Sequence, residues 1–196
     1  MADVLVQARR AATAPVVQSK TARRVIGVLV FTVLTTLGAH VAIGLPGTMV
    51  PITLQTLVVT LAGAVLGPYL GAASQLAYLA LGMAGLPVFA LGGGFAYLMG
   101  PTGGYLLSYP LAAALTGRLS GSLGSGVRGF ARIAVAMTIA SALILTLGWA
   151  QLTLLTGDAQ RALALGVLPF IIGDIVKIVI GAAIAVRLRK RTLGLL

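Results

Sequence analysis

The chain has 196 residues, of which 59% are hydrophobic and only 9% are charged. Soluble domains carry about 25% charged residues, so this composition excludes an ordinary water-soluble globular protein. With no cysteine, one histidine and three acidic residues, the chain has too few groups for disulfides, for most metal sites or for a Ser/His/Asp set. It also lacks a P-loop motif for ATP hydrolysis. We therefore expect an all-α membrane protein that is not an enzyme and holds neither a metal nor a cofactor.

The 14 basic residues give a formal net charge of +11 and lie mainly in three clusters separated by long apolar stretches. Nucleic-acid binding needs one contiguous basic face, so no nucleic-acid partner is expected. Each cluster instead predicts a cytoplasmic segment, because Lys and Arg are favoured on that side of a bilayer. The clusters are Arg9, Arg10, Lys20, Arg23 and Arg24; Arg118, Arg128 and Arg132; and Arg187, Arg189, Lys190 and Arg191.

Residues 1–23 are expected to form a basic cytoplasmic tail. A domain of six transmembrane helices should follow over 24–190, and a short C-terminal tail over 191–196. Each span needs about 20 apolar residues but can be shorter in a packed bundle. The predicted spans are 24–44, 51–66, 67–85, 100–118, 130–152 and 169–188, and several begin at a proline.

The basic clusters set the orientation of these spans. Both termini and the middle loop, residues 120–129, should be cytoplasmic, which requires an even number of spans. The outer connections are then 45–51, 86–100 and 153–168. The sequence therefore predicts a bundle of six transmembrane helices with both termini cytoplasmic.

A pair of opposite charges interrupts the apolar sequence of the last predicted span. Asp174 and Lys177 are three residues apart, so they lie on one face of a helix. Each would cost about 2.5 to 3.5 kcal/mol at a lipid-exposed helix centre, so both should face the protein interior. If the helix begins at Pro169, they lie roughly 7 Å and 12 Å from its outer end. The pair marks either a solute pathway or an ion pair that only fixes packing.

Weaker candidates for ligand contact lie on the second and third spans and in one outer connection. Gln75 and Tyr78 share a face of the third span, and Gln55 lies near the start of the second. Each can serve as a hydrogen-bond partner between helices or as a ligand contact. The three glycines at 92–94 lie in the connection 86–100, which is long enough to suggest a function. They would form a flexible loop or a backbone that approaches a bound molecule.

Five segments carry a more specific set of motifs: Pro51–Thr56, Leu61–Pro68 with Gly71, Tyr78–Phe89, Gly100–Tyr105 and Pro169–Lys177. Together they resemble the BioY family, the biotin-binding membrane components (S components) of energy-coupling factor (ECF) transporters. The resemblance covers roughly residues 24–190. It implies six helices, biotin uptake from the outer side, and a multi-pass location in a bacterial plasma (inner) membrane. It also implies partnership with a transmembrane coupling protein and ABC ATPases on other chains.

The chemistry of biotin suits the residues already singled out. Asp174 can accept hydrogen bonds from the ureido N–H groups, and Lys177 can donate to the ureido oxygen or to the valerate carboxylate. The thiophane ring and the chain suit an apolar pocket that contains Phe89 and aromatic neighbours. The predicted substrate-binding residues are Asp174, Lys177, Gln55, Gln75, Tyr78, Phe89, Gly92, Gly93, Gly94 and Tyr105.

Two other functions fit the same sequence. One is an S component for a different vitamin, and the other is an ion-coupled secondary transporter that uses Asp174 as its proton site. The family resemblance also implies a face of small residues on the first helix for docking the coupling protein. Here the first span has only a looser version of that face, such as Thr35 with Ala39.

Overall fold

The computed structural model describes residues 19–121 and 126–192, with the backbone alone for 189–192. Most of the expected N-terminal tail, part of the middle loop and the last four residues therefore lie outside the described residues. The described chain is mostly helical. Its elements are α2 (Lys20–His40), β1 (Ala42–Ile43), β2 (Ile52–Thr53), α3 (Gln55–Met83), α4 (Phe95–Leu98), α5 (Gly103–Ser120), α6 (Val127–Thr156), α7 (Ala159–Gly166) and α8 (Leu168–Thr192).

Four helical stretches of the described residues are long and apolar enough to cross a membrane. They are Lys20–His40, Gln55–Met83, Val127–Thr156 and Ala159–Leu188, the last of which joins α7 to most of α8. Their outward faces are rich in Leu, Ile and Val, as expected for helix surfaces that contact lipid.

Helix α3 contains a sharp reversal, at the position where the sequence predicts the boundary between two spans. Gly67 has φ 81° and ψ −179°, a non-helical conformation that essentially only glycine adopts, and Pro68 starts the second limb. A Cβ placed on Gly71 would lie 2.8 Å from the Cα of Gly63. Residues eight apart in a straight helix are about 12 Å apart, so the two limbs of α3 fold back against each other.

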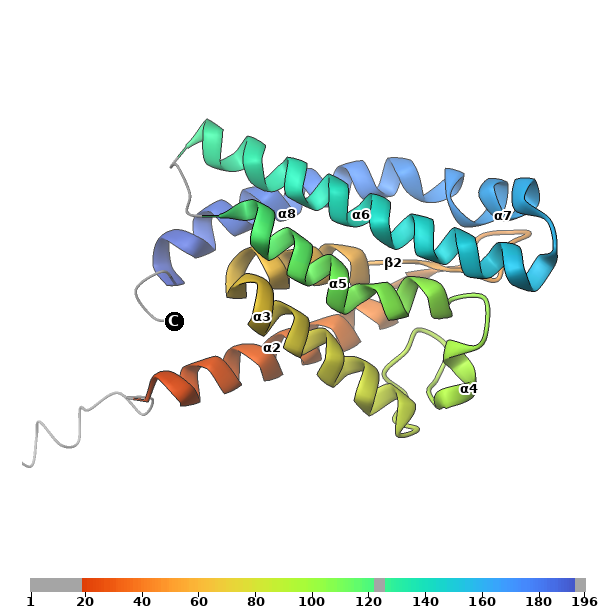
Figure 1. Cartoon of the computed structure of the whole chain (residues 1–196), viewed down its shortest axis with the longest axis horizontal. Helices are drawn as coiled ribbons and strands as arrows, with labels where there is room; N and C mark the ends of the chain where they lie inside the picture. The colour runs from red at the N-terminus through yellow and green to blue at the C-terminus, as the bar shows by residue number, and fades with distance from the viewer. Residues whose placement is uncertain (1–18, 122–125, 193–196) are drawn as a thin grey trace, which may run out of the picture.

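The helices pack around α3 and α5. Helix α3 contacts α2 and α5, while α6 contacts α5, α7 and α8, and it runs beside α8 in Figure 1. One apolar cluster, including Tyr78, Phe89 and Tyr105, surrounds the start of α3 and the connection before α5. A second cluster, including Phe31 and Met137, joins α2, α3, α6 and α8 further along the bundle.

Helix α2 is joined to the second limb of α3 by buried hydrogen bonds. The Thr32 hydroxyl donates to the Ser74 carbonyl at 3.0 Å, and the Thr35 hydroxyl donates to the Gln75 side chain at 3.3 Å. Thr35 and Ala39 are fully buried. They therefore belong to the interior of the bundle and do not provide a surface face for docking a partner.

The ends of the first two predicted spans need correction, because a short hairpin lies between them. Helix α2 ends at His40 rather than near residue 44, and α3 begins at Gln55 rather than at Pro51. The residues between them include β1 and β2, which pair antiparallel. Their backbone groups are thus used in the hairpin and are not available for helix formation.

Two of the connections that were predicted to be outer contain helices that the sequence did not predict. The predicted connection 153–168 contains the end of α6 and all of α7. The N-cap of α7 is Asp158, whose carboxylate accepts hydrogen bonds from the backbone N–H groups of Gln160 and Arg161. The connection 86–100 contains the single turn α4. Helix α5 begins at Gly103, three residues later than predicted.

Candidate ligand-binding site

A cavity lies between the start of α3 and helices α5, α6 and α8. The empty space between these elements is about 530 Å³, and part of it is open to solvent. Most of its wall is apolar or aromatic, and its charged groups are one Asp and one Lys. The lining residues are Val50, Pro51, Thr53, Gln55, Thr56, Ala90, Tyr97, Thr102, Tyr105, Leu106, Tyr109, Ile144, Leu145, Phe170, Asp174 and Lys177.

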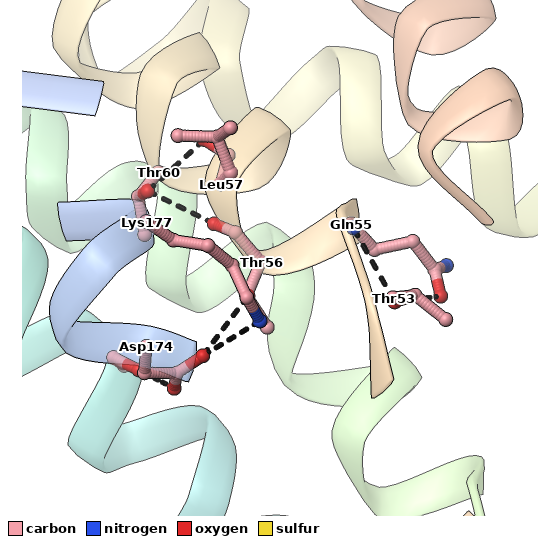
Figure 2. A network of polar contacts seen from close by, with 8 residues as sticks. Thr53, Gln55, Thr56, Leu57, Thr60, Asp174 and Lys177 are labelled. Atoms are coloured by element: carbon pink, nitrogen blue, oxygen red, sulfur yellow. Dashed lines mark hydrogen bonds and ion pairs between the residues drawn. The ribbon is translucent and has the colours of Figure 1, made fainter. Parts of the chain in front are cut away.

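The charged pair forms one wall of this cavity. The Lys177 Nζ lies 2.8 Å from Asp174 Oδ1, and both side chains are at least nine-tenths buried. Figure 2 shows Lys177 reaching from α8 to Thr56 at the start of α3, where Nζ donates to the hydroxyl at 2.9 Å. Thr56 donates in turn to Asp174 Oδ1 at 3.3 Å. Ser141 on α6 donates to Asp174 Oδ2. Three helices thus hold this carboxylate.

These contacts leave a defined hydrogen-bonding capacity for a ligand. A carboxylate can accept about four hydrogen bonds, and Asp174 accepts two at Oδ1 and one at Oδ2, so one position on Oδ2 is left. An ammonium group has three N–H donors, and Lys177 uses two on Asp174 and Thr56. The pair therefore offers an adjacent acceptor and donor to a molecule in the cavity.

A chain of hydrogen bonds runs from the cavity wall to the connection between α3 and α5, whose Ala90 and Tyr97 also line the cavity. The Gln55 amide donates to the Tyr78 hydroxyl at 2.7 Å, and this hydroxyl donates to the Val88 carbonyl at 3.1 Å. The Gln55 amide oxygen accepts a hydrogen bond from the Thr53 hydroxyl at 3.0 Å. Figure 2 shows these two residues to the right of the ion pair. Gln55 keeps one N–H and one acceptor position for a ligand.

The structure brings four of the predicted binding residues to the cavity: Asp174, Lys177, Gln55 and Tyr105. Tyr78 and Phe89 lie immediately behind its wall. Both are fully buried and form an edge-to-face pair with ring centroids 5.5 Å apart. They support the lining and do not themselves line the cavity.

The three glycines also lie outside the cavity lining. Gly92 and Gly94 have φ of 133° and 101°, which favours glycine, and a Cβ on Gly93 would collide with the Leu86 carbonyl. These residues shape the connection, whose Ala90 reaches the cavity. Gln75 is not among the residues that line the cavity. It is fully buried and bonds Thr35 on α2, so the structure does not place it at the cavity.

Sequence reasoning missed two residues that contact the charged pair, Thr56 and Ser141. Thr56 follows Gln55 directly in the sequence. A hydroxyl side chain next to a candidate ligand contact could have identified Thr56 as a further candidate. Ser141 had no such signal, because it is one of many small polar residues in apolar helices. Its importance follows from its contact with Asp174, which is 33 residues away in the sequence.

The cavity is largely apolar, has a charged pair in its wall and adjoins three helices able to cross a membrane, α3, α6 and α8. This combination is typical of a membrane protein that binds a small solute with a polar head.

Comparison with known proteins agrees with this class. The BioY family model matches residues 9–193. A probable biotin transporter BioY from Pyrococcus horikoshii is 42% identical over 172 residues, covering 87% of this chain and 99% of the relative. The biotin transporter BioY of Thermotoga maritima is 38% identical over 176 residues, covering 86% and 96%. The chain belongs to the BioY family.

The fold is similar to that of a solved structure. The crystal structure of an S-component for biotin from an ECF-type ABC transporter matches with a TM-score of 0.79 at 25% identity. The match covers 90% of this chain and 95% of the other. The chain is accordingly a multi-pass membrane protein of a transporter family and not an enzyme.

Proposed function

We propose that this chain is the biotin-binding S component of an ECF-type transporter and takes part in biotin uptake. The observation that carries the proposal is the adjacent acceptor and donor that Asp174 and Lys177 present to the cavity. A ureido group has an N–H next to a carbonyl oxygen, so one edge of it matches this arrangement. The N–H would donate to Asp174 Oδ2, and the carbonyl oxygen would accept from Lys177.

The rest of the cavity supports the same ligand. Apolar and aromatic walls formed by Leu106, Ile144, Leu145 and Phe170 suit a sulfur-containing ring and an aliphatic chain. The alternative, a proton-coupled carrier, would need Asp174 to exchange protons although its carboxylate accepts hydrogen bonds from Lys177, Thr56 and Ser141.

The proposal includes six spans, with the two limbs of α3 counted separately, and both termini in the cytoplasm. The first limb, residues 55–66, is about 18 Å long, less than the hydrocarbon thickness of about 30 Å. Non-helical backbone at membrane depth is tolerated where it lines a cavity. The hairpin before α3 meets this condition, because Val50, Pro51 and Thr53 line the cavity.

The proposed setting is a bacterial plasma membrane, where a transmembrane coupling protein and ABC ATPases on other chains would complete the transporter. The similar structure is an S-component from an ECF-type ABC transporter, which supports partner subunits on other chains, and the family and the long apolar helices support a membrane location. The proposed membrane domain covers residues 24–190, between the basic tail 1–23 and the short C-terminal tail 191–196.

The ligand is tested by native mass spectrometry of the detergent-purified chain, followed by titration with radiolabelled biotin. We expect a bound species with the mass of biotin and saturable binding without ATP or partner proteins. Accumulation of biotin in vesicles containing this chain alone, driven by a proton gradient and abolished in Asp174→Asn, would favour the ion-coupled carrier.

The orientation is tested by cysteine labelling, since the native chain has no cysteine. Cysteine at the exposed position 127, which lies in the predicted middle loop 120–129 and at the start of α6, should resist a membrane-impermeant maleimide in intact cells. Cysteine at the exposed position 159, on α7, should react. The opposite pattern would place the ion pair in the cytoplasmic half and refute capture of biotin from outside.

A further inference from the structure

Tyr109 on α5 is a buried member of the cavity wall that neither the sequence motifs nor the charged pair explains. It is only 3% exposed, and its ring stacks on that of Tyr78, with centroids 6.5 Å apart and planes at 25°. Tyr109 lines the same cavity as Asp174 and Lys177.

The hydroxyl of Tyr109 differs from those of the other two buried tyrosines. Tyr78 bonds to Gln55 and Val88, and the Tyr105 hydroxyl donates to the Gly166 carbonyl at 2.6 Å. Among residues 19–121 and 126–192, no group forms a hydrogen bond with the Tyr109 hydroxyl.

A buried tyrosine hydroxyl usually has a hydrogen-bond partner, because removing it from water without one costs free energy. Within the described chain, two side-chain hydroxyls are enclosed by protein without a partner, those of Ser120 and Thr153. The Tyr109 hydroxyl is not in this group, and Tyr109 is one of the residues that line the cavity. Tyr97 also lines the cavity, but it is partly exposed, so water can serve its hydroxyl.

We infer that the Tyr109 hydroxyl is a ligand-binding group, which hydrogen-bonds the polar head of the molecule held by Asp174 and Lys177. This inference rests on the proposed function and adds a third contact to it. A ureido oxygen can accept two hydrogen bonds, so it can be shared between an ammonium and a phenol. Because the Tyr109 ring stacks on Tyr78, its hydroxyl would already be held in position when the ligand binds.

The test compares Tyr109→Phe with Tyr105→Phe, which removes a hydroxyl that already bonds to protein. Biotin affinity and the melting temperature of the ligand-free protein are measured for both variants in detergent. Tyr109→Phe should bind biotin about 5- to 30-fold more weakly, the equivalent of one hydrogen bond. Its ligand-free melting temperature should not fall, because no protein contact is lost. Tyr105→Phe should lower the melting temperature, because the bond to Gly166 is lost.

Equal biotin affinity in Tyr109→Phe and wild type would overturn the inference and leave the proposed function intact. Weaker binding together with a lower ligand-free melting temperature for Tyr109→Phe would also overturn it, because the hydroxyl would then be structural. A wild-type chain that does not bind biotin would instead refute the proposed function. Loss of the Tyr109→Phe effect with 2-iminobiotin, which lacks the ureido oxygen, would further support the contact with that oxygen.

Discussion

Replacing Asp174 with asparagine should weaken biotin binding while keeping the shape of the side chain. The wild-type carboxylate accepts hydrogen bonds from Lys177, Thr56 and Ser141, which leaves one acceptor position for a ligand N–H. The amide removes the charge from that bond and leaves the buried Lys177 ammonium without its counter-ion. Hydrogen bonds to charged groups contribute about 1.5 to 3 kcal/mol, so the affinity should fall about 10- to 150-fold.

The assay is equilibrium binding of radiolabelled biotin to the purified protein in detergent. Asp158→Asn is the matched control, because it makes the same chemical change in the exposed N-cap of α7. It should lower stability slightly and leave biotin affinity at the wild-type value. If Asp174→Asn bound biotin as tightly as wild type, the carboxylate would have no part in the site, and the donor–acceptor match would be refuted.

Three further variants test other contacts. Lys177→Met should also weaken biotin binding at least tenfold in the same assay; unchanged binding would remove the ammonium from the site. Ser141→Ala should weaken binding about three- to tenfold, with rescue by Ser141→Thr and no further loss in the Asp174→Asn background. An additive loss there would mean that Ser141 does not act through the carboxylate. Gly67→Ala should destabilise the fold by about 1 to 3 kcal/mol, because of backbone strain alone, and preserve biotin affinity. An unchanged melting temperature would show that the turn tolerates a side chain.

The large elements of the fold could be predicted because apolar length and proline position are local signals. The Gly67–Pro68 step marks a real reversal of the chain, and the spans of α6 and α8 follow from their hydrophobicity. The hairpin of β1 and β2 could not be predicted, since strands of two residues are too short to show a period. The N-cap residue Asp158 was a sequence signal for the start of α7. The polar residues around it favoured a loop instead, so the helix was not predicted.

The site was predictable where charge alone decides the direction of a side chain. Asp174 and Lys177 face the interior because lipid contact would be costly, and their spacing puts them on one face. Gln75 was a less reliable indication, because an interior amide can bond a neighbouring helix as easily as a ligand. The roles of Ser141 and Tyr109 depend on which helices become neighbours, and that information is not present in the sequence around them.

The reversal of α3 bears on how the chain is inserted during synthesis. Gly67 alone separates the two limbs, and no charged residue lies between positions 25 and 117 to anchor either limb on one side. A translocation machinery that reads flanking charges would therefore find no signal at this turn. The limbs should leave the machinery as a preformed pair, so a defect in one of them would also misplace the other.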